Sequence, residues 1–370
     1  MINFLLLLLI PVIIAVAVLI FSKGKITIPE FGGLIAAPAL LAWLLISLFT
    51  YKDMKSKELW NGQITAKHRD EVSCSHSYEC NCYYTEECSG SGSNRTCSSV
   101  RHCSTCYEHR YDVDWNLDAS TKESMSIDRI DRQGLGMPPR WGSAFVGEPF
   151  TSEHSYDNYL LLHKDSVLFG GEGNVDKFRP LIPPYPKVYD YYRANHFMLL
   201  GGPLVDSKVW NWLVNEANKK LGPTKQVDLI FIVVKTADPN YVRALKTAWL
   251  GAQKNDFVVV IGSLDGHKIE FADVVSWSPK EDLKVEVRDL IQGTTLDDRD
   301  KIVNGTADLV NAKFQRLHMK EYKYLLSTVE LTTGEMTTSM ILCVLAEIGL
   351  VIFFLYLNSK ERYETSSYRY

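Results

Sequence analysis

The sequence lacks the local patterns of common enzymes and of nucleic-acid-binding proteins. It contains no P-loop, no protein-kinase signature, no H-E-x-x-H zinc-protease motif and no recognisable Ser/His/Asp order. A net charge of only −4 offers no basic surface for nucleic acid. The glycine and spaced carboxylates of an EF-hand loop are also missing. These absences favour a binding or structural protein over an enzyme, and they give no support to a nucleic-acid partner.

Charge is missing from three long stretches of the chain. Residues 1–22 and 31–51 carry no charged side chain, and residues 336–359 carry only Glu347. An apolar helix of roughly 20 residues is long enough to cross the hydrocarbon core of a membrane. We therefore predict three transmembrane helices in an integral membrane protein. They span about residues 3–22, 32–50 and 336–358.

The first apolar stretch is expected to be an anchor and to set the orientation. No Lys or Arg precedes it, although the basic region of a cleaved signal peptide requires one. Lys23 and Lys25 follow it, and positive residues favour the cytoplasmic side of a membrane. We therefore expect residues 1–51 to form a helical hairpin with its loop inside and the large domain outside, in a periplasmic or extracellular position. The tail, 359–370, then lies in the cytoplasm.

Glu347 lies near the middle of the third apolar stretch. A carboxyl group at this depth is costly unless it is protonated, paired or turned toward protein. We expect an intramembrane polar residue that faces the hairpin or another copy of the chain. The alternative is an ion or proton path, in which case the chain is a subunit of an oligomeric channel or transporter.

Seven of the eight cysteines fall within the 33 residues from Cys74 to Cys106. A flexible Ser/Gly run at 89–94 separates two Cys-containing stretches, which predicts a β-hairpin. One register of this hairpin sets two pairs of cysteines opposite each other, and opposed residues lie within reach of a disulfide. The predicted disulfides are Cys88–Cys97, Cys82–Cys103 and, from neighbouring positions, Cys80–Cys106. Cys74 is left over.

Zinc is the alternative for the same cysteines. A C-x-C and a C-x2-C pair are able to converge as four thiolates on one tetrahedral ion. The candidate ligands are Cys80, Cys82, Cys103 and Cys106, with His76, His102 and His109 as substitutes. Disulfides persist outside the cytoplasm, whereas zinc thiolates suit a reducing compartment. Redox-active thiols are a third alternative.

The rest of the chain predicts two further modules. Short polar and aromatic runs broken by glycine and proline indicate a Cys-rich β module over 52–204. Over 205–325, apolar patterns of helical and strand period alternate in the order α-β-α-β-β-α-α, so helices are expected to cover a small mixed sheet. The predicted fold is membrane-anchored α+β: a helical hairpin, the Cys-rich β module, the α/β module and a terminal membrane helix.

Short motifs in the α/β module resemble the TPM domain over about residues 205–320. They are the helix end Ala248-Trp249-Leu250-Gly251, the turn Lys254-Asn255-Asp256 before an apolar strand, and the hairpin into Ile269-Glu270. The turn of the family typically reads Asp-Asn-Gly, and the glycine is missing here. The Cys block and the stretch Asp-Arg-Ile-Asp-Arg-Gln-Gly at 128–134 also look similar to uncharacterised membrane proteins of tailed bacteriophages.

The TPM resemblance implies a module tethered on the extracytoplasmic side of a membrane. Members of the family are described as acid phosphatases, calcium binders, or assembly and repair factors. The resemblance makes Asp256 a candidate metal carboxylate, and the acidic residues Asp265 and Glu270 follow it in the sequence. No cofactor is expected from the sequence as a whole, with zinc or calcium as the alternatives.

Three functions follow from these features. The favoured one is an extracytoplasmic interaction or scaffold protein that is anchored in the membrane and assembles with membrane proteins or with copies of itself. A metal-dependent, acid-phosphatase-like phosphohydrolase of TPM type is the second, and such catalysis requires carboxylates that converge on one cation. A subunit of an oligomeric channel or transporter is the third.

Overall fold

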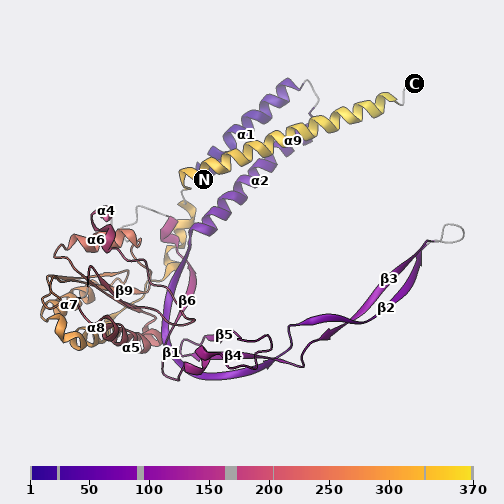
Figure 1. The fold of residues 1–370 in the computed structure, drawn as a ribbon. Helices are drawn as coiled ribbons and strands as arrows, with labels where there is room; N and C mark the ends of the chain where they lie inside the picture. Colours follow the sequence, from indigo (N-terminus) through magenta and orange to yellow (C-terminus); the bar gives the residue numbers. More distant parts are fainter. Residues whose placement is uncertain are drawn as a thin grey trace.

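The computed structural model shows an apolar helical bundle, a body built on two β-sheets, and a two-stranded arm (Figure 1). It describes residues 2–22, 26–89, 96–162, 173–202, 204–328 and 331–367. Lys23 and Lys25, most of the Ser/Gly run of the hairpin, and residues 368–370 of the tail lie outside the described residues. The molecule is thus a mixed α/β protein whose apolar helices stand apart from its sheets.

Three helices form the bundle: α1 (Ile2–Phe21), α2 (Ile28–Asp53) and α9 (Thr333–Ser367). By length and composition, each is able to cross a membrane. Each helix contributes three buried residues to the contact between the helices. These residues are spaced four apart, so they lie on one face of their helix. These residues are Leu7, Pro11 and Ala15 of α1, Leu34, Pro38 and Ala42 of α2, and Ser339, Cys343 and Glu347 of α9.

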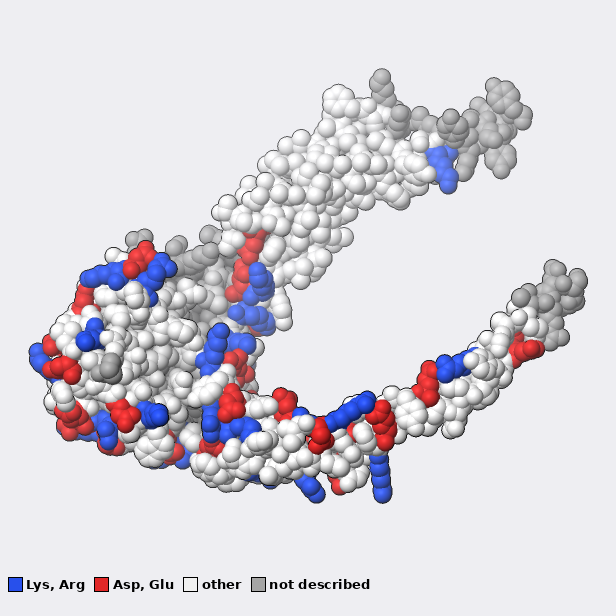
Figure 2. All heavy atoms as spheres, in the orientation of Figure 1, with Lys and Arg blue, Asp and Glu red and all other residues white. Residues whose placement is uncertain are grey.

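Charged side chains avoid the bundle. On the face shown in Figure 2, the bundle is almost free of charge along its length, whereas the body and the arm carry both signs. The three stretches that lack charge in the sequence are therefore the three helices of the bundle. Helix α9 continues past residue 358, the predicted end of the last apolar span, as far as Ser367.

A long strand, β1 (Lys55–Val72), follows α2 almost directly and organises the first sheet. Its first half pairs with β6 (Pro149–Asp157) and its second half with β4 (Asp112–Ala119), both antiparallel. Strand β5 (Ser124–Ile127) completes the order β5-β4-β1-β6. The core of this sheet contains Ile64, Trp115, Leu117, Phe150 and Tyr192, with the short helix α3 (Pro139–Ser143) beside it.

The arm extends from this sheet as a hairpin of β2 (Ser77–Ser89) and β3 (Thr96–Tyr107), drawn in purple in Figure 1. Disulfides join Cys80 to Cys106, Cys82 to Cys103 and Cys88 to Cys97, and these are the predicted pairs. The pairing of the strands is not one uniform register. A β-bulge between Cys80 and Tyr83, with Asn81 at a φ of 48°, shifts it so that Cys80 lies opposite Ser104.

The second sheet contains parallel strands β7 (Phe197–Leu200), β8 (Asp228–Val234) and β9 (Asp256–Gly262), with β10 (Phe271–Ser276) antiparallel at the edge. All residues of β8 and β9 are buried, because helices cover both faces. Helices α5 (Ser207–Lys225), α7 (Glu281–Gln292) and α8 (Arg299–Lys313) cover one face. Helices α6 (Asn240–Ala248) and α4 (Val175–Phe178) cover the other.

From residue 205 onward the elements follow the expected order α-β-α-β-β-α-α. The sheet itself starts earlier, however, because β7 pairs with β8, whereas the sequence places residues up to 204 in the Cys-rich β module. A strand of four residues flanked by irregular chain gives little periodicity. It is defined by its pairing with β8, whose residues lie 34 positions later. Two short 3-10 helices, η2 (Tyr159–Leu162) and η6 (Met319–Thr328), connect the body to the base of the bundle. Two others lie elsewhere in the body: η4 (Arg179–Leu181) and η5 (Leu296–Asp298).

Candidate functional site

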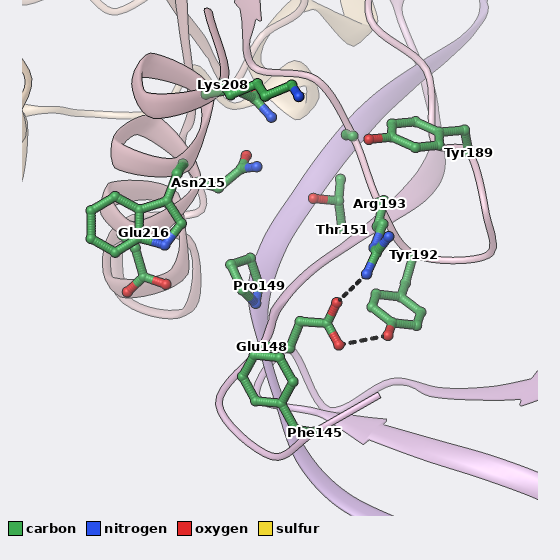
Figure 3. A pocket seen from close by; sticks show the side chains of 13 residues that line it. Phe145, Glu148, Pro149, Thr151, Tyr189, Tyr192, Arg193, Lys208, Asn215 and Glu216 are labelled. Carbon is green, nitrogen blue, oxygen red and sulfur yellow. Dashed lines mark hydrogen bonds and ion pairs between the residues drawn. The ribbon is translucent and has the colours of Figure 1, made fainter. Parts of the chain in front are cut away.

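A groove of about 320 Å³ lies between the first sheet and α5 (Figure 3). We call it the sheet–helix groove, and its walls come from residues 145–151, 189–194 and 208–216. Phe145, Tyr189 and Trp212 expose much of their aromatic surface around it. Protein interfaces favour tyrosine, tryptophan and arginine as anchoring residues, so the composition of the groove suits a protein partner.

One wall of the groove holds a buried carboxylate, Glu148, with three partners. The hydroxyl of Tyr192 donates to it at 2.8 Å and Nη2 of Arg193 donates at 2.9 Å (Figure 3). Nη2 of Arg140 lies 3.5 Å from the carboxylate. Burial by itself raises the pKa of Glu148, but the hydrogen bonds from Arg193 and Tyr192 and the charge of Arg140 outweigh burial and hold the pKa below its usual range. Glu148 therefore stays ionised at neutral pH.

The same contacts hold the side chains of this wall in fixed protonation states. Burial and the Glu148 carboxylate raise the pKa of Tyr192, which keeps its proton. The described residues that line the groove include no Cys, His or Ser to serve as nucleophile or base. A fixed ion pair beside exposed aromatic rings is suited to holding one or two side chains of a partner.

The carboxylates suggested by the TPM resemblance do not converge on one cation. Asp256 begins β9, whereas Asp265 and Glu270 lie beyond the far end of that strand, roughly 20 Å away by the rise of a β-strand. Backbone N–H groups of His267 and Lys268 donate to Asp265 and lower its pKa. Glu270 pairs with Lys268. The three residues therefore do not form one metal site in the structure.

Asp256 is buried at the start of β9, next to Asp228 on β8. The hydroxyl of Tyr185 lies 2.8 and 3.0 Å from its two oxygens, and the backbone N–H of Gln253 donates at 2.7 Å. Burial and the charge of Asp228 raise the pKa of Asp256 well above its usual range. Asp228 itself lies 3.1 Å from Nε2 of the buried His196. Asp256 is thus an enclosed structural carboxyl group whose protonated form is favoured by the fold.

We expect Asp256→Asn to stabilise the protein at pH 8. Because the folded chain raises the pKa of Asp256, the wild-type stability is greatest below about pH 4 and falls as pH rises toward that raised pKa. Asparagine has nearly the same shape and does not titrate. Thermal unfolding of the full chain in detergent should show a gain of about 1 kcal/mol or more, a few degrees in Tm, at pH 8 and almost none at pH 4.

Asp265→Asn is the control for this experiment and has the opposite expected sign. The lowered pKa of Asp265 means that its ionised form stabilises the fold above about pH 4, and that this contribution is lost as pH falls. The Asn variant should therefore be less stable than the wild type at pH 8. If the Tm of Asp256→Asn equals that of the wild type at both pH values, the assignment of a protonated Asp256 is wrong.

The zinc alternative at Cys80, Cys82, Cys103 and Cys106 does not hold in the structure. All four sulfurs are paired in disulfides, and the ligand that zinc requires is a thiolate. The two cysteines left free are Cys74 and Cys343, both buried. The compartment argument agrees with the pairing, because disulfides persist where the environment is oxidising.

Glu347 is buried on the face of α9 that also carries Cys343. Cys343 packs with Leu7 of α1 and Ala42 of α2, so this face points into the bundle. Among the described residues, neither carboxyl oxygen of Glu347 has a hydrogen-bond partner, and the same holds for the hydroxyl of Ser339. The bundle therefore has polar groups in its interior rather than a purely apolar seam.

No known protein family, curated protein or solved structure matches the chain. The residues of the sheet–helix groove come from three separate segments and form no motif in the sequence. The only local signal is the run Tyr189-Asp-Tyr-Tyr-Arg193, whose composition is typical of protein interfaces.

Proposed function

We propose that the chain is a membrane-anchored scaffold protein, with its body and arm outside the cytoplasm, which binds membrane proteins or copies of itself. The observation that carries this proposal is the arm. Four of its tyrosines are between 51 and 68% exposed, on a ribbon whose side chains are mostly exposed. They are Tyr78, Tyr83, Tyr84 and Tyr107.

The construction of the arm supports a binding role. A two-stranded hairpin is marginally stable in water because it has no core of its own. Here three disulfides replace the missing core and restrict the unfolded chain. A ribbon that is already ordered loses little conformational entropy when it binds, and exposed tyrosines supply rigid contact area. The arm thus has the properties of a preorganised binding element.

Anchoring and sidedness have separate support. The bundle offers three helices that are long and apolar enough to span a membrane. The body joins the bundle at one end only, through α2 into β1 and through η6 into α9, so the body lies on one side of any membrane that the bundle crosses (Figure 1). The disulfides favour an oxidising compartment for the body. The predicted tail, 359–370, then lies in the cytoplasm.

The α/β module favours binding over catalysis. Its elements follow the order α-β-α-β-β-α-α that the sequence predicts. The TPM family, which the module resembles in short motifs, includes assembly factors as well as acid phosphatases. A phosphohydrolase needs carboxylates that face a bound cation. Asp256 is instead enclosed by Tyr185 and Gln253, so a role in assembly is the better proposal.

Photocrosslinking tests the proposal. A photoreactive amino acid in place of Tyr84, in the full chain expressed in membranes, should give one adduct of defined mass that contains a membrane protein or a second copy of the chain. The adduct should disappear when Tyr78 and Tyr83 are both changed to Ser. The same reagent at Leu264, an exposed turn residue of the body, is the matched control. Equal yields at Tyr84 and Leu264 would contradict a binding role for the arm.

A further inference from the structure

Four side chains of metal-binding type meet where the arm leaves the first sheet. Cys74 and His76 lie in the link from β1 to β2, and His109 lies in the link from β3 to β4, which begins at Asp112. One ligand atom from each residue lies within 4.8 Å of the others. Cys74 is the one cysteine of the Cys-rich block that has no disulfide partner.

The distances within this cluster suit a tetrahedral ion. Sγ of Cys74 and Oδ1 of Asp112 each lie 3.6 Å from Nδ1 of His109. A ring nitrogen of His76 lies within 4.8 Å of the other ligand atoms, and its Nδ1 lies 3.8 Å from Oδ2, the second oxygen of Asp112. Zinc bonds of about 2.0–2.3 Å, set at tetrahedral angles, place neighbouring ligand atoms roughly 3.3–3.8 Å apart. An ion at the centre of the cluster therefore reaches all four residues after small side-chain movements.

Two atoms of the cluster are buried without a hydrogen-bond partner among the described residues. They are Oδ1 of Asp112, whose side chain is fully buried, and Nδ1 of His76. The other oxygen of Asp112 is well satisfied, because the backbone N–H and hydroxyl of Ser75 and the guanidinium of Arg129 donate to it. Unsatisfied buried polar atoms are costly, whereas partners of this kind commonly orient a ligand whose free atoms bind a metal.

The thiol of Cys74 is also placed as a ligand. It is buried, and the backbone N–H of His76 points at its sulfur from 3.4 Å. Every other cysteine of the block is joined in a disulfide, so Cys74 has no sulfur to pair with inside the arm. Two imidazoles and a carboxylate surround it instead.

We propose that Cys74, His76, His109 and Asp112 bind one zinc ion. One thiolate, two imidazoles and one carboxylate are ligand types that zinc accepts, and four protein ligands make a closed, structural site. The ion joins the link that enters the arm to the link that leaves it. It thereby fixes the direction in which the arm projects from the first sheet.

Metal analysis of the purified full chain in detergent tests this site. Reductant is omitted, so that the six paired sulfurs cannot act as ligands. After dialysis against zinc chloride and removal of free metal, the wild type should retain one zinc ion per chain. Cys74→Ser and His109→Gln should lose it, whereas His102→Gln should retain it. His102 is the matched control, because it lies in the arm and contacts Thr85 rather than the cluster.

Three further measurements guard against a variant that misfolds. Zinc should protect Cys74 of the wild type from maleimide, and cobalt in place of zinc should give a thiolate-to-metal absorption band that Cys74→Ser abolishes. Mass spectrometry should show three disulfides in every variant. A wild type that retains no zinc and whose Cys74 reacts equally with and without it would overturn the proposal. So would zinc that survives in both Cys74→Ser and His109→Gln.

Discussion

Reduction of the three disulfides is expected to unfold the arm and to leave the body folded. No described residue of the arm belongs to a buried apolar cluster, so the bridges carry most of its stability. One disulfide typically contributes about 2–4 kcal/mol by restricting the unfolded chain. The body has apolar cores on both faces of its second sheet and loses none of them on reduction.

Hydrogen exchange of the full chain, measured by mass spectrometry, distinguishes the two parts. After reduction, amides of residues 77–107 should exchange as in an unfolded chain, while those of β8 and β9 remain protected. The variant Cys88→Ser with Cys97→Ser is the control, because it removes only the bridge nearest the tip, whose cysteines are 9 residues apart. Exchange should then increase only near the tip. Protected arm amides after full reduction would show that the strands hold together without the bridges.

Gly222→Ala is expected to weaken the contact between the first sheet and α5. A methyl group at Gly222 would overlap the backbone carbonyl of Asn61 on β1, which cannot rotate away as a side chain can. Asn61 donates to Asp228 at 2.7 Å and accepts from Thr151 at 2.8 Å, and all three side chains are buried. Displacing β1 disturbs both bonds, so we expect a loss of about 3 kcal/mol or more.

Thermal unfolding of the full chain in detergent checks this prediction. Gly293→Ala is the matched control, since a methyl group there would come no closer than 3.4 Å to any atom and its φ is −81°. That variant should stay within about 0.5 kcal/mol of the wild type. A wild-type Tm for Gly222→Ala would mean that β1 and α5 are not held as closely as the structure shows.

Features that depend on local spacing were predictable from the sequence. Missing charge located the bundle helices, periodicity located the helices and strands after residue 205, and the spacing around the Ser/Gly run located the disulfides. In each case the interacting residues belong to one element or to neighbouring strands. Such elements are largely specified by side chains within a few turns or strand pairs of one another.

Features that depend on distant contacts were not predictable. In the sequence, Asp256 is a turn residue and a candidate metal carboxylate. In the structure it is buried and bonded to Tyr185, 71 residues earlier. The groove combines the β6 turn with α5, and the cluster at Cys74 forms because Val72 of β1 pairs with Asp112 of β4. Neither the contact that forms the groove nor the pairing of β1 with β4 has a signal in the sequence, since several strands have the composition to pair with β1.

Strand β1 also gives the arm a direct covalent connection to the bundle. Its 18 residues measure about 60 Å along the chain and run, with a bend, from the end of α2 to the base of the arm without a flexible linker (Figure 1). Tension applied to the arm therefore reaches the bundle through the covalent bonds of one extended strand, and no hydrogen bond of the sheet has to break to transmit it. Pulling on whatever the arm holds would load the bundle before it unravels the body.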